Sequence, residues 1–292
     1  MALQEALASG KFVITSELGP PKGVDMAPLV ADAVLCRGRV DAFAVTDNQS
    51  SVMKMDPLVA CLRLMEAGLP PILQITCRDR NRLALQSMLL SAANLGLRDI
   101  VCLTGDHVLL GDDQEAMPVF DIDSVHLLEA VQGLMAGHDM ADNELEGEPP
   151  EFFVGCVASP GSIPMEPQVL KLEKKVAAGA QFVLTQAIYD MDVLAQFMQA
   201  VRHIAVPIIG GFVVLKSARM AHHMNKHTAG VTVPDHLIDE LDACTDRDER
   251  REKAIEIAAR LVKGIKGLCR GVHIMSLGWD RHIPAILDAA GL

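Results

Sequence analysis

The sequence has few aromatic residues and lacks the common nucleotide- and cluster-binding signatures. Only 3% of its 292 residues are aromatic, with a single Trp and a single Tyr. There is no Gly-x-Gly-x-x-Gly and no Walker loop, which argues against a Rossmann dinucleotide site and against an NTPase. The seven cysteines are scattered without a Cys-x-x-Cys pair, so neither a zinc ribbon nor an iron–sulfur cluster is indicated. We expect most of them to be small buried hydrophobic residues.

Basic residues are also scarce, since 26 Lys and Arg oppose 38 Asp and Glu, for a formal net charge of -12. This balance argues against a nucleic-acid partner. No apolar run reaches the roughly 18–20 residues that a membrane span needs. The N-terminal residues lack the basic segment and apolar core of a secretory signal. We therefore expect a cytoplasmic protein with no nucleic-acid or membrane partner.

The histidines give one weak signal for a metal. His223 and His227 are spaced i,i+4 on a predicted helix, a spacing that can bind zinc. No His-Glu-x-x-His pattern accompanies them, and the helix is expected on the outside of the fold. We predict a solvated helix face and no metal site.

Eight apolar, β-rich runs recur along the chain, with helical periodicity between them. They are Phe12–Leu18, Ala42–Asp47, Ile72–Cys77, Ile100–Asp106, Phe152–Ser159, Phe182–Ile188, Pro207–Val214 and Val272–Leu277. The clearest helical segments are Met55–Glu66, Arg80–Asn94, Ser124–Met135, Met165–Ala178 and Arg250–Lys266. Continuously apolar runs are typical of parallel strands buried on both faces. The pattern predicts one α/β domain over residues 1–292, a (β/α)8 TIM barrel, with a doubly wound open sheet as the alternative. The acidic stretch Asp142–Glu151 is predicted to be an exposed loop.

Several predicted strands end in polar residues, at the edge where β/α barrels carry their active sites. Glu17 ends the first strand, because Pro20 and Pro21 cannot continue it. A carboxyl group half out of a core must be paired, hydrated or protonated. Asp106 follows Gly105 in the turn after the fourth strand. Ordinary loop capping explains such residues only in part, so we interpret this edge as the candidate site.

Six short segments, in this order and at these strand ends, resemble the methylenetetrahydrofolate reductase family of flavin-dependent β/α barrels. They are Ser16–Pro21, Val45-Thr46, Ile75–Cys77, Gly105-Asp106, Leu170–Ala180 and Thr185-Gln186. The ending Gly271–Asp280 is similar to the short bacterial branch found with acetyl-CoA-pathway enzymes. The resemblance implies reduction of 5,10-methylenetetrahydrofolate to 5-methyltetrahydrofolate, with hydride passing from flavin N5 to an N5 iminium.

The resemblance also implies roles for four residues around the substrate. Glu17 matches the general acid that opens the imidazolidine ring by protonating N10, and desolvation at the strand end would favour its protonated form. Asp106 matches the carboxylate that stabilises the cationic intermediate. Gln186 matches a folate-contacting residue, and Phe212 is expected to stack on the substrate.

The implied cofactor is FAD, with FMN as the alternative. The matching positions are Thr46, Gln74, Thr104, Gly105 and Asp106 around the ring, Lys171, Lys174, Lys175 and Ala180 around the phosphates and ring edge, and Phe120 and Asp121 around adenine and its ribose. Gln74 and Thr104 stand where many members have His and Arg. Electrons are expected from NAD(P)H or from a partner subunit, in a homo- or hetero-oligomer. For the lysines, a solvated helix face is the alternative.

Two other functions remain open at the level of sequence. One is a flavin-free lyase or aldolase that uses Glu17 and Asp106 as acid and base, although no strand-end Lys offers a Schiff base. The other is a non-catalytic pterin-binding barrel that presents folate to another subunit. Flavin absorbance would separate both from the reductase.

Overall fold

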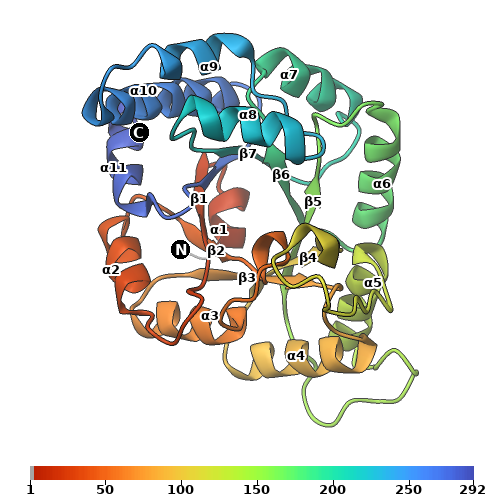
Figure 1. The fold of residues 1–292 in the computed structure, drawn as a ribbon. Coiled ribbons are helices and arrows are strands. Elements are labelled where there is room, and N and C mark those ends of the chain that lie inside the picture. Colours follow the sequence, from red (N-terminus) through yellow and green to blue (C-terminus); the bar gives the residue numbers. More distant parts are fainter. Residues whose placement is uncertain (1–2) are drawn as a thin grey trace.

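The computed structural model describes residues 3–292 and shows a closed barrel of eight parallel strands in chain order (Figure 1). The strands are β1 (Val13–Leu18), β2 (Ala42–Val45), β3 (Pro71–Thr76), β4 (Asp99–Leu103), β5 (Phe153–Ala158), β6 (Phe182–Ala187), β7 (Ile208–Val213) and β8 (Gly271–Met275). Strand β8 pairs with β1 and closes the barrel. The predicted TIM barrel is confirmed, and each predicted strand agrees with an observed strand to within a few residues.

Helices cover the barrel, with α1 at its amino-terminal end and the others in an outer ring (Figure 1). They are α1 (Leu3–Ala8), α2 (Ala27–Leu35), α3 (Pro57–Glu66), α4 (Arg82–Asn94), α5 (Ser124–Met135), α6 (Glu166–Ala177), α7 (Met191–Ala200), α8 (Ala218–His227), α9 (Asp235–Asp242), α10 (Arg247–Lys266) and α11 (Ile283–Ala290). Short 3₁₀ turns are η1 (Gln49–Ser51), η2 (Val108–Leu110) and η3 (Asp280–His282). Within residues 3–292, no helix is long and apolar enough to cross a bilayer.

Helix starts follow capping side chains more closely than they follow hydrophobic periodicity. The segment predicted from Arg250 begins at Arg247, because the Asp246 carboxylate accepts hydrogen bonds from the first-turn backbone N–H groups. Similarly, α3 begins at Pro57, where the Asp56 side chain accepts from the backbone of Leu58. The predicted boundaries were therefore displaced by two or three residues.

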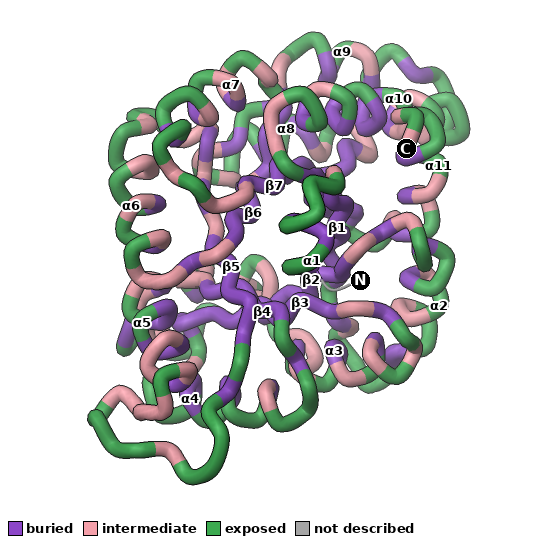
Figure 2. Tube along the Cα trace, turned by 180° about the vertical axis from the view of Figure 1, so that it is seen from behind, coloured by how far each residue is buried: buried purple, intermediate pink, exposed green. Residues whose placement is uncertain are grey.

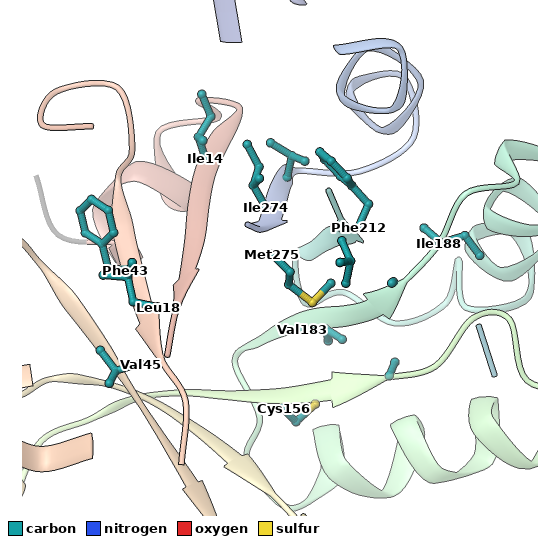
Figure 3. Close-up of a cluster of buried hydrophobic side chains, with 14 of the residues drawn as sticks. Ile14, Leu18, Phe43, Val45, Cys156, Val183, Ile188, Phe212, Ile274 and Met275 are labelled. Carbon is teal, nitrogen blue, oxygen red and sulfur yellow. The ribbon is translucent and has the colours of Figure 1, made fainter. Parts of the chain in front are cut away.

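Alternation along the strands divides the apolar residues between two cores. One core fills the lower interior of the barrel and includes Leu3, Ala6 and Leu7 of α1, which closes its amino-terminal end. The second lies between the strands and the outer helices and is drawn in part in Figure 3. In the lower interior the Phe182 ring lies against Gly155, where a Cβ atom would come within 2.4 Å of it. The lower interior of the barrel is thus filled mainly by apolar side chains, and most of its buried polar residues lie toward the carboxyl end.

Two further expectations concern the surface and the thiols. The acidic loop Asp142–Glu151 extends away from the barrel and is mostly exposed, as predicted (Figure 2).

All seven cysteines are free, and six are buried. Burial raises the pKa of the Cys36 thiol to about 12. These cysteines are small hydrophobic residues, in agreement with the prediction.

Candidate active site

The carboxyl ends of the strands surround a cavity of about 360 Å³. It is lined by residues of β1, β3 to β6 and β8, of the loops after β2 and other strands, and of α6. The predicted site residues among them are Glu17, Thr46, Gln74, Thr104, Gly105, Asp106, Lys171, Lys175 and Gln186. The structure therefore brings together nine of the residues that sequence analysis singled out, at the edge where β/α barrels carry their active sites.

Of the two predicted carboxyl groups that line the cavity, those of Glu17 and Asp106, Glu17 is the more enclosed. It lies near the end of β1 and is only 9% exposed. Its Oε1 accepts a hydrogen bond from Nε2 of Gln49 at 2.7 Å. Its Oε2 lies 3.8 Å from Nε2 of His273. Glu17 thus has a different polar neighbour at each oxygen.

Sequence analysis did not identify His273 as a site residue. It faces the barrel interior from β8, is 2% exposed, and lies with Nδ1 2.9 Å from Oγ1 of Thr15. Strand register explains this position, because Thr15 is paired with His273 and Glu17 with Met275. The alternation Gly271, His273, Met275 along the last predicted strand was the signal that could have revealed it.

Two polar atoms next to the cavity have no hydrogen-bond partner within residues 3–292. They are Oγ1 of Thr46 and Oδ1 of Asp47, and both residues are buried. The other Asp47 oxygen accepts from the backbone and hydroxyl of Thr76 and from Nη1 of Arg80, at 2.7–2.9 Å. Buried polar atoms without partners are costly, and a bound ligand is one way to satisfy them.

The turn after β4 depends on Gly105, whose φ of +93° is in the left-handed region. A Cβ atom there would lie 3.1 Å from Cβ of Arg78 and of Thr76. Arg78 is fully buried, forms two hydrogen bonds with Asp79, and reaches the carbonyl of Asp106 through Nη1 at 3.4 Å. Arg78 is a second cavity residue that the sequence analysis missed. Asp106 itself is exposed at the rim.

Helix α6 supplies a cationic wall. Lys171 and Lys175, one turn apart, both line the cavity, whereas Lys174 lies on a different face beside α5. Lys175 is buried and donates to the carbonyl of Val157 at 2.6 Å. Burial lowers the pKa of its ammonium group. Both lysines are placed to face an anionic ligand.

Phe212 does not reach the cavity. It is 0% exposed and paired in register with Ile274, in the outer apolar core (Figure 3). On β8, Ile274 alternates with the inward-facing His273 and therefore points toward the outer helices. Phe212 is paired with Ile274, so its side chain points the same way. The expectation that it stacks on a substrate is therefore dropped.

Four further predicted residues also lie outside the cavity lining. Lys174 is one of them, and Ala180 is buried in the outer core. Phe120 stacks on His107, with ring centroids 6.1 Å apart. The Asp121 carboxylate pairs with Arg82, and this hydrogen bond lowers the pKa of Asp121. Phe120 and Asp121 remain candidates for contacts beyond the cavity, on the loop that follows β4.

The fold and the cavity together define a β/α barrel with an acidic group at the end of β1 and a cationic wall on α6. A profile of the family described as Methylenetetrahydrofolate reductase matches residues 2–291. The chain belongs to this family.

The relatives share limited identity and are longer than this chain. A probable methylenetetrahydrofolate reductase (NADPH) of Caenorhabditis elegans is 25% identical over 80% of this chain and 34% of its own length. Methylenetetrahydrofolate reductase (NADH) 1 of Zea mays is 24% identical over 99% of this chain and 50% of its own length. The chain thus spans about a third to a half of these relatives.

Solved structures share the fold. An uncharacterized protein from Clostridium thermocellum, described as binding two copies of 5-methyl-5,6,7,8-tetrahydrofolic acid, has a TM-score of 0.63 and 16% identity. The alignment covers 99% of this chain and 95% of that one. A 2,3-dimethylmalate lyase gives a TM-score of 0.53 at 13% identity. At these identities the likeness shows the fold alone.

Proposed function

We propose that the protein catalyses the flavin-dependent reduction of 5,10-methylenetetrahydrofolate to 5-methyltetrahydrofolate, with Glu17 as the proton donor. The observation that carries the proposal is an enclosed carboxyl group at the barrel mouth in a chain of this family. The Clostridium thermocellum protein of the same fold is described as binding 5-methyltetrahydrofolate, the product of this reaction.

The residues of the cavity fit a flavin. The buried Thr46 hydroxyl has no partner within the described chain, so a polar ring edge would satisfy it. Lys171 and Lys175 offer cationic donors for phosphate oxygens. We propose that these residues, with Gln74 and Gly105, hold FAD or FMN. When bound, the flavin supplies the two electrons that reduce the bridging carbon.

The proton chemistry belongs to the chain itself. The bridging methylene becomes electrophilic only when N10 of the substrate is protonated and the five-membered ring opens. Glu17 is only 9% exposed and lines the cavity, so its carboxyl group can reach a bound substrate and is the proposed donor of this proton. The Asp106 carboxylate lies at the rim of the same cavity, where its negative charge would stabilise the cationic ring-opened substrate. Gln186 is the proposed folate contact.

The Glu17→Gln substitution tests this assignment, because the amide keeps the shape of the side chain but carries no transferable proton. Reduction of the flavin should stay within about twofold, whereas reoxidation by methylenetetrahydrofolate should fall by about 10²–10⁴-fold. Stopped-flow absorbance measures both half-reactions. Glu252→Gln, on the exposed face of α10, is the matched control.

Two outcomes would contradict the proposal. Equal loss of both half-reactions would make Glu17 a structural residue. A colourless protein that neither FAD nor FMN reconstitutes would exclude the flavin and favour a lyase or a folate-presenting barrel.

The electron donor forms part of the proposal. We propose NAD(P)H or an electron-delivering partner subunit in a homo- or hetero-oligomer. Anaerobic addition of NADH to the purified chain separates these, because rapid bleaching of the flavin shows direct reduction. If the flavin bleaches only after the native partners are added, a partner subunit delivers the electrons.

A further inference from the structure

The two oxygens of the Glu17 carboxyl group face different elements of the barrel. Oε1 accepts from Nε2 of Gln49, on the loop after β2, at 2.7 Å. Oε2 lies 3.8 Å from Nε2 of His273 on β8. Thr15, two residues before Glu17, lies 2.9 Å from the other nitrogen of His273 and fixes that ring from below. The carboxyl group is therefore oriented by the hydrogen bond to Oε1, while Oε2 lies beside His273 without a hydrogen bond to it.

The loop that carries Gln49 has an uncommon backbone. Asn48, Ser50 and Ser51 have φ values of 44°, 56° and 58°, a left-handed conformation that non-glycine residues rarely adopt. Such conformations persist where the surroundings over-determine them, and they concentrate at functional sites.

Neighbouring groups hold this loop in place. The Asn48 carbonyl accepts from Nη2 of the buried Arg78 at 3.2 Å, and its side-chain oxygen accepts from the backbone of Lys54 at 2.8 Å. On the other side, Gly111 lies so close to the Ser51 carbonyl that a Cβ atom would come within 1.9 Å of it. Gln49 is thus presented to Glu17 by a rigid loop.

We propose that Gln49 is a positioning residue that fixes Oε1 of Glu17 as a hydrogen-bond acceptor and leaves the transferable proton on Oε2. This inference rests on the proposed function of Glu17 as the proton donor. During transfer the O–H bond at Oε2 breaks, an N–H bond forms at N10 of the substrate, and negative charge develops on the carboxylate. The N–H group of Gln49 is already in place to stabilise that charge.

Within residues 3–292, His273 is the one basic side chain with a nitrogen within 4 Å of a Glu17 carboxylate oxygen. The remaining charged groups of the cavity are Asp47, Arg78, Asp106, Lys171 and Lys175. Gln49 is thus a neutral side chain that donates a hydrogen bond directly to Glu17. Replacing it removes that hydrogen bond without changing the charge of the cavity.

The Gln49→Met variant tests the proposal, since Met has a similar length but no N–H donor. We expect the folate half-reaction to slow by about 10-fold or more, as for the loss of a hydrogen bond to a charged group. Flavin reduction and the Kd of methylenetetrahydrofolate should stay within about twofold. Gln199→Met, on the exposed surface of α7, is the matched control. A second variant, Gln49→Asn, is too short to reach Oε1 and should repeat the effect if the first does not fold.

A measurement without flavin or folate separates this inference from the proposed function. In protein labelled with ¹³C at glutamate carboxyl groups, the signal that Glu17→Gln removes belongs to Glu17. We expect Gln49→Met to move that signal and Gln199→Met to leave it unchanged. An unmoved signal, or an unchanged rate of the folate half-reaction in an active enzyme, would overturn the role of Gln49. Equal slowing of both half-reactions would also overturn it, in favour of a structural role. If the wild type itself does not react with folate, the proposed function fails, and the ¹³C signal still decides whether Gln49 holds Glu17.

Discussion

Single residues fix the shape of the barrel mouth through backbone conformation as well as through chemistry. Gly105 places Asp106 at the rim by adopting a φ of +93° above the Arg78 and Thr76 side chains. Asp47 uses one oxygen to join β2, β3 and Arg80, and leaves the other without a partner inside the described chain. At this scale, geometry and charge depend on a few positions that tolerate little change.

Replacing Gly105 with alanine should destabilise the protein and distort the mouth. Alanine at this φ is strained, and its Cβ would lie 3.1 Å from two other side chains. We expect the free energy of unfolding to fall by about 1–3 kcal/mol, together with weaker flavin binding. Denaturant titration measures the first effect and flavin absorbance the second.

Gly38→Ala provides the control for backbone strain. Gly38 has a φ of +77°, but a Cβ atom added there would have nothing within 4 Å, so only the conformational cost of about 1 kcal/mol applies. Equal losses in the two variants would show that close packing at Gly105 contributes nothing.

At the scale of elements, the strands and helix α6 contribute different side chains to the cavity. Strands β1 and β8 place Glu17 and His273 inside the mouth, whereas α6 extends Lys171 and Lys175 from the outer ring. Lys174, between them in sequence, lies on another face of the same helix. The 3.6-residue period of α6 therefore decides which lysines line the cavity at the barrel mouth.

This period predicts unequal effects from two neighbouring substitutions. Lys171→Ala should raise the Kd of the flavin by about 10–100-fold, because it removes the proposed charge-assisted contact to phosphate. Lys174→Ala should change the Kd by less than about twofold. Fluorescence titration of the flavin-free protein with FAD and with FMN measures both. A similar rise in Kd for both variants would show that the lysines act through general electrostatic attraction and not through a specific contact.

The sequence was sufficient to predict the barrel and most of the mouth, since continuous apolar runs and polar strand ends are local signals. It was not sufficient to predict which way Phe212 faces. That depends on its register with Ile274, on a strand distant in sequence. His273 was missed for the same reason, because its role arises from pairing with Thr15. The position of Gln49 depends on the left-handed backbone of its loop, and the Asn and Ser residues there did not predict that conformation.

For the molecule as a whole, one buried carboxyl group should make stability depend on pH. Asp99 begins β4 beside Ile72 and Phe153 of the lower interior, is 8% exposed, and has no hydrogen bond or ion pair to its carboxylate within residues 3–292. Burial raises its pKa from 3.8 to about 6. The folded state therefore disfavours the ionised form.

The sign of the effect follows from this raised pKa. The stabilising effect of neutral Asp99 is fully present below about pH 4 and is lost as the pH rises through 6. The interval between the two pKa values corresponds to at most about 3 kcal/mol. Asp99→Asn should thus be more stable than the wild type at pH 7.5, and the difference should disappear near pH 4. Urea denaturation at both pH values measures it.

Asp142→Asn, in the exposed acidic loop, is the control for that comparison, because its difference from the wild type should not vary with pH. An Asp99→Asn difference that is the same at both pH values would show that this carboxyl group is not held neutral by burial.

The division of the mouth between strands and α6 has a consequence for divergence within the family. In the proposed function, the residues that recognise the cofactor's charge and the residue that delivers the proton belong to separate segments of the chain, α6 and β1. If these roles hold, mutations in α6 would alter the preference for an anionic cofactor without moving the acid. Cofactor preference and proton chemistry would then diverge independently within the family.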